Sequence, residues 1–205
     1  MKSEIITSRW YDLLGERCLR YYKKSQDREV AQLRDLLKKI SPKATILDAG
    51  CGIGKPVSKF LTQKKYNVIG IDISKEMVKK ARKNVPKAQF KVMSMYDLKF
   101  PLKKFDAIIS FFVILHLEKS KISKVFKDFH RILKERGYLL FSINRGKTEG
   151  YLEFYGKEIF LSTYTKEEIE EILGKTGFRI IWKKDLFFRK EGQREHQLYY
   201  FVQKK

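Results

Sequence analysis

A glycine-rich turn between a short apolar strand and a helix most strongly constrains the fold of this chain. Residues 45–48 predict the strand, glycines follow at positions 50, 52 and 54, and a helix is expected over residues 56–64. Small residues at such a turn let the backbone approach a ligand closely, next to the start of the helix. The segment therefore predicts a strand–turn–helix unit whose turn binds a ligand.

The same alternation of strand and helix continues along the chain. We expect strands at residues 67–72, 89–93, 105–110 and 138–143, and two final strands at 178–182 and 197–202. Helices are expected at residues 8–40, 75–84, 122–133 and 165–175. Repeated strand–helix units favour a parallel, doubly wound sheet that binds ligands beyond the carboxyl ends of its strands. The last two strands have no helix between them, which predicts an antiparallel hairpin at the edge.

Two acidic residues indicate what kind of ligand the turn accepts. Asp72 ends the second strand, 22 residues after Gly50, where a carboxylate can accept hydrogen bonds from two ribose hydroxyls. The turn spaces its glycines as G-x-G-x-G, whereas a dinucleotide-binding turn has G-x-G-x-x-G. Asp48, two residues before Gly50, would repel a pyrophosphate but suit a cationic ligand. A nucleotide-dependent oxidoreductase is therefore a disfavoured alternative.

Four parts of the sequence resemble motifs of the class I S-adenosylmethionine-dependent methyltransferases. They are residues 46–54 (ILDAGCGIG), residues 68–77 (VIGIDISKEM), residues 98–110 (LKFPLKKFDAIIS) and residues 130–140 (HRILKERGYLL). The resemblance implies an α/β fold, with a Rossmann-like, doubly wound, mainly parallel seven-stranded sheet. An antiparallel C-terminal edge hairpin and an N-terminal helical lid complete it. We expect one methyltransferase domain over residues 1–205: a lid at 1–43, a cofactor-binding core at 44–146, and a substrate-side lid with the hairpin at 147–205.

The resemblance also implies the cofactor and the residues around it. S-adenosyl-L-methionine would be the methyl donor, and S-adenosyl-L-homocysteine the product. The glycine turn would line the methionine half, Asp72 would hold the ribose hydroxyls, and an aromatic residue near the N-terminus would cover the methionine carboxylate. The predicted cofactor-binding residues are Tyr11, Asp48, Ala49, Gly50, Cys51, Gly52, Gly54, Asp72, Ile73, Met77, Ser94, Met95, Ser110 and Phe111.

One position departs from the family pattern. Ser94 stands where the family often has an acid that accepts a hydrogen bond from the adenine amino group. Asp97 follows three residues later, too far along the chain to be a simple replacement. The resemblance therefore leaves the backbone at Met95 to hold the adenine.

The acceptor side is less well defined by the sequence. His116 follows the fourth strand, where its imidazole is a candidate catalytic base; otherwise it bonds a neighbouring loop. Tyr151, Tyr155 and Tyr164 belong to an aromatic cluster after the fifth strand. This cluster is either a substrate wall or part of the core, and we keep the three tyrosines as substrate-side candidates.

The charge of the chain leaves two classes of acceptor open. Its 45 Lys and Arg residues against 24 Asp and Glu residues give a formal net charge of +21, which favours contact with polyanions such as RNA. Lysines nevertheless occur all along the sequence, as on a surface that is basic throughout. We therefore predict a small-molecule acceptor, with tRNA or rRNA as the alternative. A non-catalytic domain that only binds S-adenosylmethionine is the third possibility.

Composition and hydropathy exclude several other classes. The 205 residues are 43% hydrophobic, enough to build a core. No apolar run approaches the roughly 20 residues that cross a bilayer, and the N-terminus has no apolar leader segment. The sequence shows no cluster of Cys and His residues with metal-ligand spacing. We expect a cytoplasmic protein with no metal and no membrane contact; the sequence gives no oligomeric state.

Overall fold

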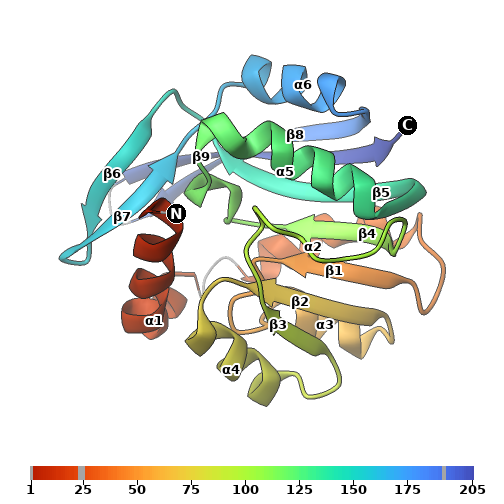
Figure 1. Ribbon diagram of the computed structural model, residues 1–205, viewed down its shortest axis with the longest axis horizontal. Coiled ribbons are helices and arrows are strands. Elements are labelled where there is room, and N and C mark those ends of the chain that lie inside the picture. The colour runs from red at the N-terminus through yellow and green to blue at the C-terminus, as the bar shows by residue number, and fades with distance from the viewer. Residues whose placement is uncertain (1, 23–25, 191–192) are drawn as a thin grey trace.

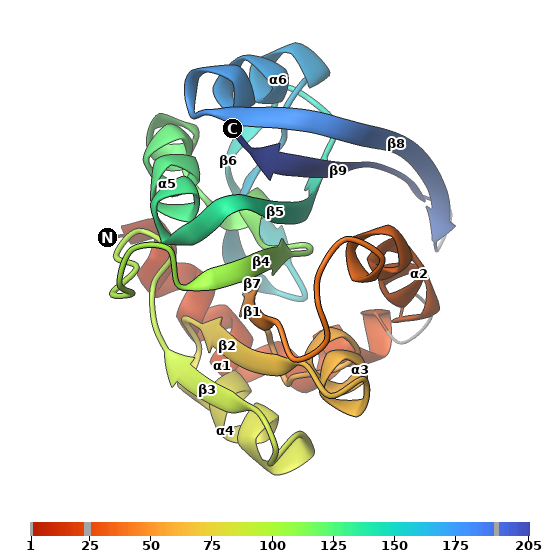
Figure 2. The same ribbon diagram turned by 90° about the vertical axis from the view of Figure 1, so that its right-hand side faces the viewer.

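The computed structural model describes residues 2–22, 26–190 and 193–205, and the side chains within them apart from 14–27 and 188–195. It forms a seven-stranded sheet with helices on both faces and a separate two-stranded hairpin (Figures 1 and 2). The helices are α1 (Lys2–Tyr22), α2 (Gln26–Leu37), α3 (Val57–Gln63), α4 (Lys75–Asn84), α5 (Lys119–Ile132) and α6 (Lys166–Lys175), with a short 3₁₀ helix, η1 (Ile114–His116).

The sheet has the strand order β3-β2-β1-β4-β5-β9-β8. Its strands are β1 (Thr45–Ala49), β2 (Asn67–Asp72), β3 (Gln89–Val92), β4 (Phe105–Ser110), β5 (Leu133–Asn144), β8 (Phe178–Lys190) and β9 (Gln193–Lys204). The first five pair in parallel, and β9 lies antiparallel between β5 and β8. The predicted fold class, a mainly parallel seven-stranded sheet with an antiparallel C-terminal hairpin, is confirmed.

Two apolar clusters cover the two faces of this sheet. On one face, Phe126 and Phe129 of α5 and Leu173 of α6 pack on strand residues such as Leu47 and Phe141. The other cluster joins α2 and α3 to the opposite side chains of the same strands. Its fully buried members include Leu33, Leu36, Ile46, Leu61, Ile109 and Leu140. Neighbouring residues 46 and 47 thus face opposite clusters, as the pleat of a strand requires.

The structure differs from the predicted elements in the N-terminal helix, in the aromatic stretch after β5 and at the boundary between α5 and β5. The single helix expected at residues 8–40 is two helices, α1 and α2, and α1 begins at Lys2. The aromatic stretch after β5 contains a hairpin that the sequence analysis did not identify, β6 (Glu149–Phe154) and β7 (Lys157–Ser162). The helix expected at 122–133 ends one residue earlier, and β5 begins at Leu133. In Figure 1 the β6–β7 hairpin and α1 lie together at one end of the sheet.

The start of α6 has a complete capping box. Thr165 Oγ1 accepts a hydrogen bond from the Glu168 backbone N–H at 3.2 Å, and Glu168 Oε2 accepts one from the Thr165 N–H at 2.7 Å. These reciprocal bonds satisfy two backbone donors that the first turn of a helix leaves without partners.

We predict that Thr165→Ala lowers the free energy of unfolding by about 1 kcal/mol, because the backbone N–H of residue 168 then loses its acceptor. The measurement is urea unfolding followed by circular dichroism. Thr165→Ser keeps the hydroxyl and serves as the control. Equal losses in the two variants would show that the methyl group, and not the cap, carries the effect.

Candidate active site

A cavity opens where β1, β2 and β4 end, and α1 covers one side of it. Its wall combines the glycine turn, the ends of these strands, the segment after β4 and parts of α1 and α2. The lining residues from the sheet side include Asp48, Gly50, Cys51, Gly52, Asp72, Ile73, Met77, Met93, Met95, Phe111, Phe112 and His116. Those from the two N-terminal helices are Glu4, Thr7, Tyr11 and Glu29. This is the edge at which a parallel sheet of this type binds ligands.

The glycines of the turn serve different purposes. Gly50 has a φ of 83°, and a Cβ there would lie 2.1 Å from a Val113 methyl carbon, so the position requires close packing. Gly52 has a φ of 52°, lines the cavity, and would point a Cβ into open space. Gly54 instead packs against Val85 and Phe90, away from the cavity wall. The turn therefore leaves open space at Gly52, whereas Gly50 and Gly54 pack closely against side chains from other segments.

Asp72 is held rigidly at the end of β2. One carboxylate oxygen accepts a hydrogen bond from the Gly52 N–H at 2.9 Å, and the other accepts one from the Ser74 N–H at 2.9 Å. Each oxygen keeps a second lone pair for another donor. Burial raises the pKa of Asp72 to about 6, with a smaller contribution from Asp12 in the same direction. At neutral pH the group is thus mostly ionised and oriented to accept two further hydrogen bonds.

Asp48 is a second carboxylate beneath the turn. It is only 4% exposed, and Oδ2 accepts a hydrogen bond from the Ser58 hydroxyl at 2.5 Å. Burial raises the pKa of Asp48 from its ordinary value of 3.8 to about 7. Because a buried anion without a counterion is costly, the wall around Asp48 favours a cationic ligand.

Tyr11 and His116 form a hydrogen-bonded pair in the wall of the cavity. The imidazole Nδ1 lies 3.0 Å from the Phe160 carbonyl oxygen, which can only accept, so Nδ1 carries the proton. The Tyr11 hydroxyl lies 2.8 Å from Nε2 and donates to it. Burial lowers the pKa of His116 to about 4, so the ring is neutral at pH 7. This arrangement fixes the tautomer of His116 and the orientation of the Tyr11 phenol.

The structure brings most of the predicted cofactor residues into one wall. Lining the cavity are Tyr11, Asp48, Gly50, Cys51, Gly52, Asp72, Ile73, Met77, Met95 and Phe111. The other four lie just behind this wall: Ala49, Gly54, Ser94 and Ser110. Cys51 is a buried free thiol. Ser94 donates a hydrogen bond to the Glu4 carboxylate, which does line the cavity.

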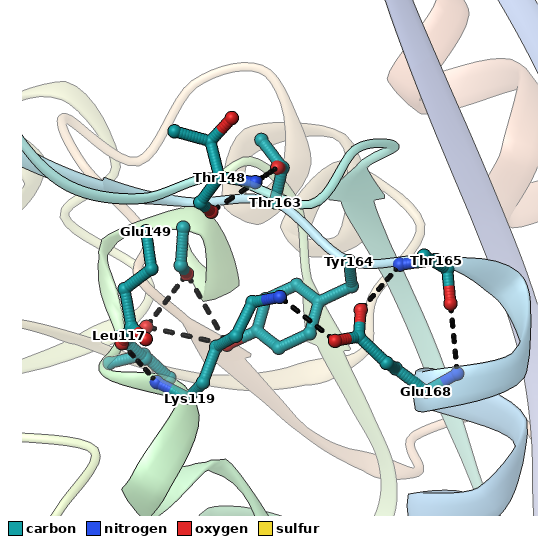
Figure 3. A network of polar contacts seen from close by, with 9 residues as sticks. Leu117, Lys119, Thr148, Glu149, Thr163, Tyr164, Thr165 and Glu168 are labelled. Carbon is teal, nitrogen blue, oxygen red and sulfur yellow. Dashed lines mark hydrogen bonds and ion pairs between the residues drawn. The ribbon is translucent and has the colours of Figure 1, made fainter.

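Of the substrate-side candidates, only His116 lines the cavity. Tyr164 is 1% exposed, and its hydroxyl donates to the Leu117 carbonyl at 3.3 Å. Figure 3 shows Tyr164 beside Lys119, whose Nζ lies 5.1 Å from the ring centre and 3.0 Å from Glu168 Oε1. Tyr151 and Tyr155 are instead exposed on the β6–β7 hairpin. The aromatic cluster is thus divided between core and surface, because Tyr151 and Tyr155 belong to the hairpin whereas Tyr164 follows β7 and is buried.

Glu4, Thr7 and Glu29 are lining residues that the sequence analysis missed. They lie on α1 and α2, outside every recognised motif. The only available signal was the spacing of residues 4, 7 and 11, which places them on one face of a helix. Because that face is polar, the sequence alone does not distinguish it from a surface exposed to solvent.

Comparison with known proteins identifies the family. Residues 46–137 match the family model described as a methyltransferase domain. Over 99% of this chain, the structure resembles magnesium protoporphyrin IX methyltransferase from Synechocystis PCC 6803, with a TM-score of 0.79, 19% identity and coverage of 100% of that chain. Residues 46–137 thus carry the methyltransferase domain, and the solved structures that share the fold of the chain include S-adenosylmethionine-dependent methyltransferases. The predicted enzyme class and cofactor are thereby confirmed.

Relatives of this methyltransferase differ in how much of their length the chain spans. An uncharacterized protein of Methanocaldococcus jannaschii, MJ1252, is 28% identical over 200 residues, which cover 84% of this chain and 76% of the relative. Malonyl-[acyl-carrier protein] O-methyltransferase of Hamiltonella defensa is 35% identical over 100 residues, covering 49% of this chain and 38% of that protein. Among the described residues, no helix is long and apolar enough to cross a membrane, and no three potential metal-binding side chains gather together.

The cavity wall fits the family's cofactor on structural grounds. The Oγ1 of Thr7 is buried in the wall and has no hydrogen-bond partner among the described residues. A buried hydroxyl of this kind favours a polar ligand. Open space at Gly52, two acceptor sites on Asp72 and the acidic surroundings of Asp48 match a cationic molecule that carries a ribose diol.

We predict that Asp48 makes a contribution to stability that is lost as pH rises from about 4 to about 7, whereas His116, whose pKa is lowered to about 4, contributes in the opposite direction. The folded-state pKa of Asp48 lies above its ordinary value, so this carboxyl binds more protons in the folded protein than in the unfolded chain over this range. Asp48→Asn keeps an oxygen for Ser58 and should remove this loss. A residual slope is expected from Asp72, which shifts in the same direction. Urea unfolding at a series of pH values measures both; an unchanged slope in Asp48→Asn would contradict the assignment.

Proposed function

We propose that this chain transfers a methyl group from S-adenosylmethionine to a small organic acceptor. The observation that carries the proposal is that one cavity is lined both by the rigid Asp72–Gly52 arrangement and by Phe111, Phe112 and His116 from the segment after β4. The first set is suited to the ribose and methionine parts of the cofactor, and the second to an acceptor. Proteins similar to this chain are named for acceptors as different as a methylenesterol and magnesium protoporphyrin IX.

The residues of this chain would act mainly by binding and orientation. When bound, S-adenosylmethionine supplies an activated methyl group on a sulfonium. Asp72 would accept hydrogen bonds from the ribose hydroxyls, and ionised Asp48 would favour the positive charge nearby. Holding donor and acceptor in line supplies much of the rate enhancement for such a transfer.

His116 is better suited to positioning the acceptor than to removing its proton. Its Nε2 already accepts from Tyr11, and the surrounding burial disfavours the imidazolium form. An acceptor therefore meets the Tyr11 phenol rather than a free imidazole. This pair is suited to an acceptor that needs orientation and little help from a base.

The apolar part of the wall supports a small acceptor with a hydrophobic body. Phe111 is 8% exposed and Phe112 lines the same cavity, beside Val113 and Leu117. The α1 helix covers the cavity from the other side. A hydrogen bond from Trp10 Nε1 to the Phe154 carbonyl oxygen, at 3.0 Å, connects this helix to the β6–β7 hairpin. A covered, partly aromatic cavity is typical of small-molecule sites.

We predict that Asp72→Ala weakens binding of S-adenosylhomocysteine about 10- to 100-fold, because a charge-assisted hydrogen bond contributes about 1.5–3 kcal/mol. Isothermal titration calorimetry measures the affinity, and circular dichroism checks the fold. Asp97→Ala removes the same charge from a side chain that is 67% exposed and is the matched control. Equal affinity in the two variants would contradict the ribose assignment.

Transfer itself is tested with a methyl-labelled donor and a panel of small acceptors, metabolite extract and RNA. Label in a small molecule supports the proposal. Binding of the donor without transfer to any acceptor in the panel would favour a domain that only binds the cofactor. Label in RNA alone would favour the second acceptor class.

The net charge of +21 and the exposed Tyr151 and Tyr155 are the observations that favour RNA. We predict that RNA affinity falls steeply as salt rises from about 50 to 200 mM, because binding to phosphates releases counterions. The fall should be equal in the native protein and in the double variant Tyr151→Ala, Tyr155→Ala. A component that resists salt and vanishes in the double variant would contradict the small-molecule proposal, because stacking of bases on aromatic rings is less screened.

A further inference from the structure

The cavity face of α1 is fixed by contacts on both sides of the site. Asp12 Oδ1 accepts hydrogen bonds from the Ser74 hydroxyl and, at 3.2 Å, from the Glu76 N–H. At the beginning of the helix, the Ser3 hydroxyl donates to Glu118. Between these contacts, the side chains at positions 4, 7 and 11 all line the cavity. Residues of α1 are therefore held in the wall by their own set of polar contacts.

Glu4 brings a carboxylate to the position where the family motif lacks one in this chain. The Ser94 hydroxyl donates its proton to Glu4 Oε1, and Ser94 Oγ accepts from the Tyr96 N–H at 2.9 Å. A carboxylate has about four acceptor sites, so Glu4 can accept from a ligand donor as well as from Ser94. Where the family often has an acid at position 94, this chain therefore has a serine together with a carboxylate from α1, which is far away in the sequence.

The surroundings of Glu4 have the character of a site for a flat, apolar ring with a polar edge. Ser94 lies between Met93 and Met95, and both methionines line the cavity together with Ile73 and Met77. Thioether and branched side chains adapt to the faces of a ring. Since Ser94 bonds Glu4, the carboxylate lies at the edge of this apolar wall.

We propose that Glu4 of α1 accepts the hydrogen bond of the cofactor's adenine amino group, in the role that the family usually gives to an acid at position 94. The inference rests on the proposed function. Thr7 supports it independently, because its buried Oγ1 on the same helix face has no partner among the described residues. Adenine recognition would thereby depend on α1 being seated on the cavity.

The chemistry of the purine edge makes the proposal specific. An amino group at the purine 6-position donates to a carboxylate, whereas a 6-oxo group presents an oxygen acceptor and repels it. The 6-oxo analogue of S-adenosylhomocysteine therefore separates a direct contact from a general effect on the fold.

The experiment measures the affinities of S-adenosylhomocysteine and its 6-oxo analogue by calorimetry. We expect the native protein to prefer the 6-amino compound at least about 10-fold, and Glu4→Ala to lower its affinity for that compound about 10- to 100-fold. Affinity for the 6-oxo analogue should not fall, because the carboxylate that repels its oxygen is removed. Ile5→Ala, an exposed position on the same helix, is the matched control.

A second variant tests whether an acid at position 94 can replace the acid at position 4. Ser94→Asp in the native background should weaken binding, because two carboxylates then face each other. In the Glu4→Ala background, Ser94→Asp should restore both the affinity and the preference for the 6-amino compound. This rescue also shows that a loss in Glu4→Ala does not come from failure to fold.

The outcomes separate the two proposals. If the native protein binds S-adenosylhomocysteine but Glu4→Ala retains both affinity and preference, the Glu4 assignment is wrong and the proposed function stands. If Ser94→Asp fails to rescue a folded Glu4→Ala variant, the exchange of roles is wrong. If the native protein binds neither compound, both proposals are overturned.

Discussion

The two hydrogen bonds that Asp72 accepts hold the site together. One comes from Gly52 in the glycine turn after β1 and the other from Ser74 in the turn that begins α4, so a single carboxylate connects two loops whose donors are 22 residues apart. Burial makes its charge costly, and the two N–H donors offset part of that cost. If the carboxylate is lost, Gly52 and the start of α4 lose a common anchor. The shape of the cavity thus depends on one group, the same group that we propose binds the ribose diol.

Most of the sheet follows from the sequence because its strands are apolar on both faces. Residues 46 and 47, or 108 and 109, are fully buried toward opposite helical layers, so they appear in the sequence as continuous apolar runs between turn residues. The β6–β7 hairpin is different. Most of β6 is exposed, and its polar residues at 149 and 153 resemble a loop. Tertiary contacts with α1, rather than its own pattern, place that hairpin.

The residues of the site also include some that the sequence predicts and some that it does not. Asp48, Gly52 and Asp72 were predictable because the motif that contains them is local, and pairing of β1 with β2 brings its parts together. The approach of Glu4 to Ser94 joins residues 90 positions apart, and no spacing in the sequence encodes it. The tyrosines show that closeness in sequence is not closeness in space. Residues 151 and 155 are exposed on the hairpin, whereas Tyr164, which follows β7, is buried in the core.

The placement of β9 between β5 and β8 has a consequence for synthesis of the chain. Strand β9 is the last element in the sequence, yet it is the neighbour through which β8 joins the sheet. Until residues 193–204 have left the ribosome, β5 has one unpaired edge. Leu140 and Phe141 of β5, which are fully buried in the complete fold, then lie in an edge strand. An open edge of this kind can pair with other chains. A chain in which β1 to β5 have paired before β9 is added would therefore present an open edge to other chains.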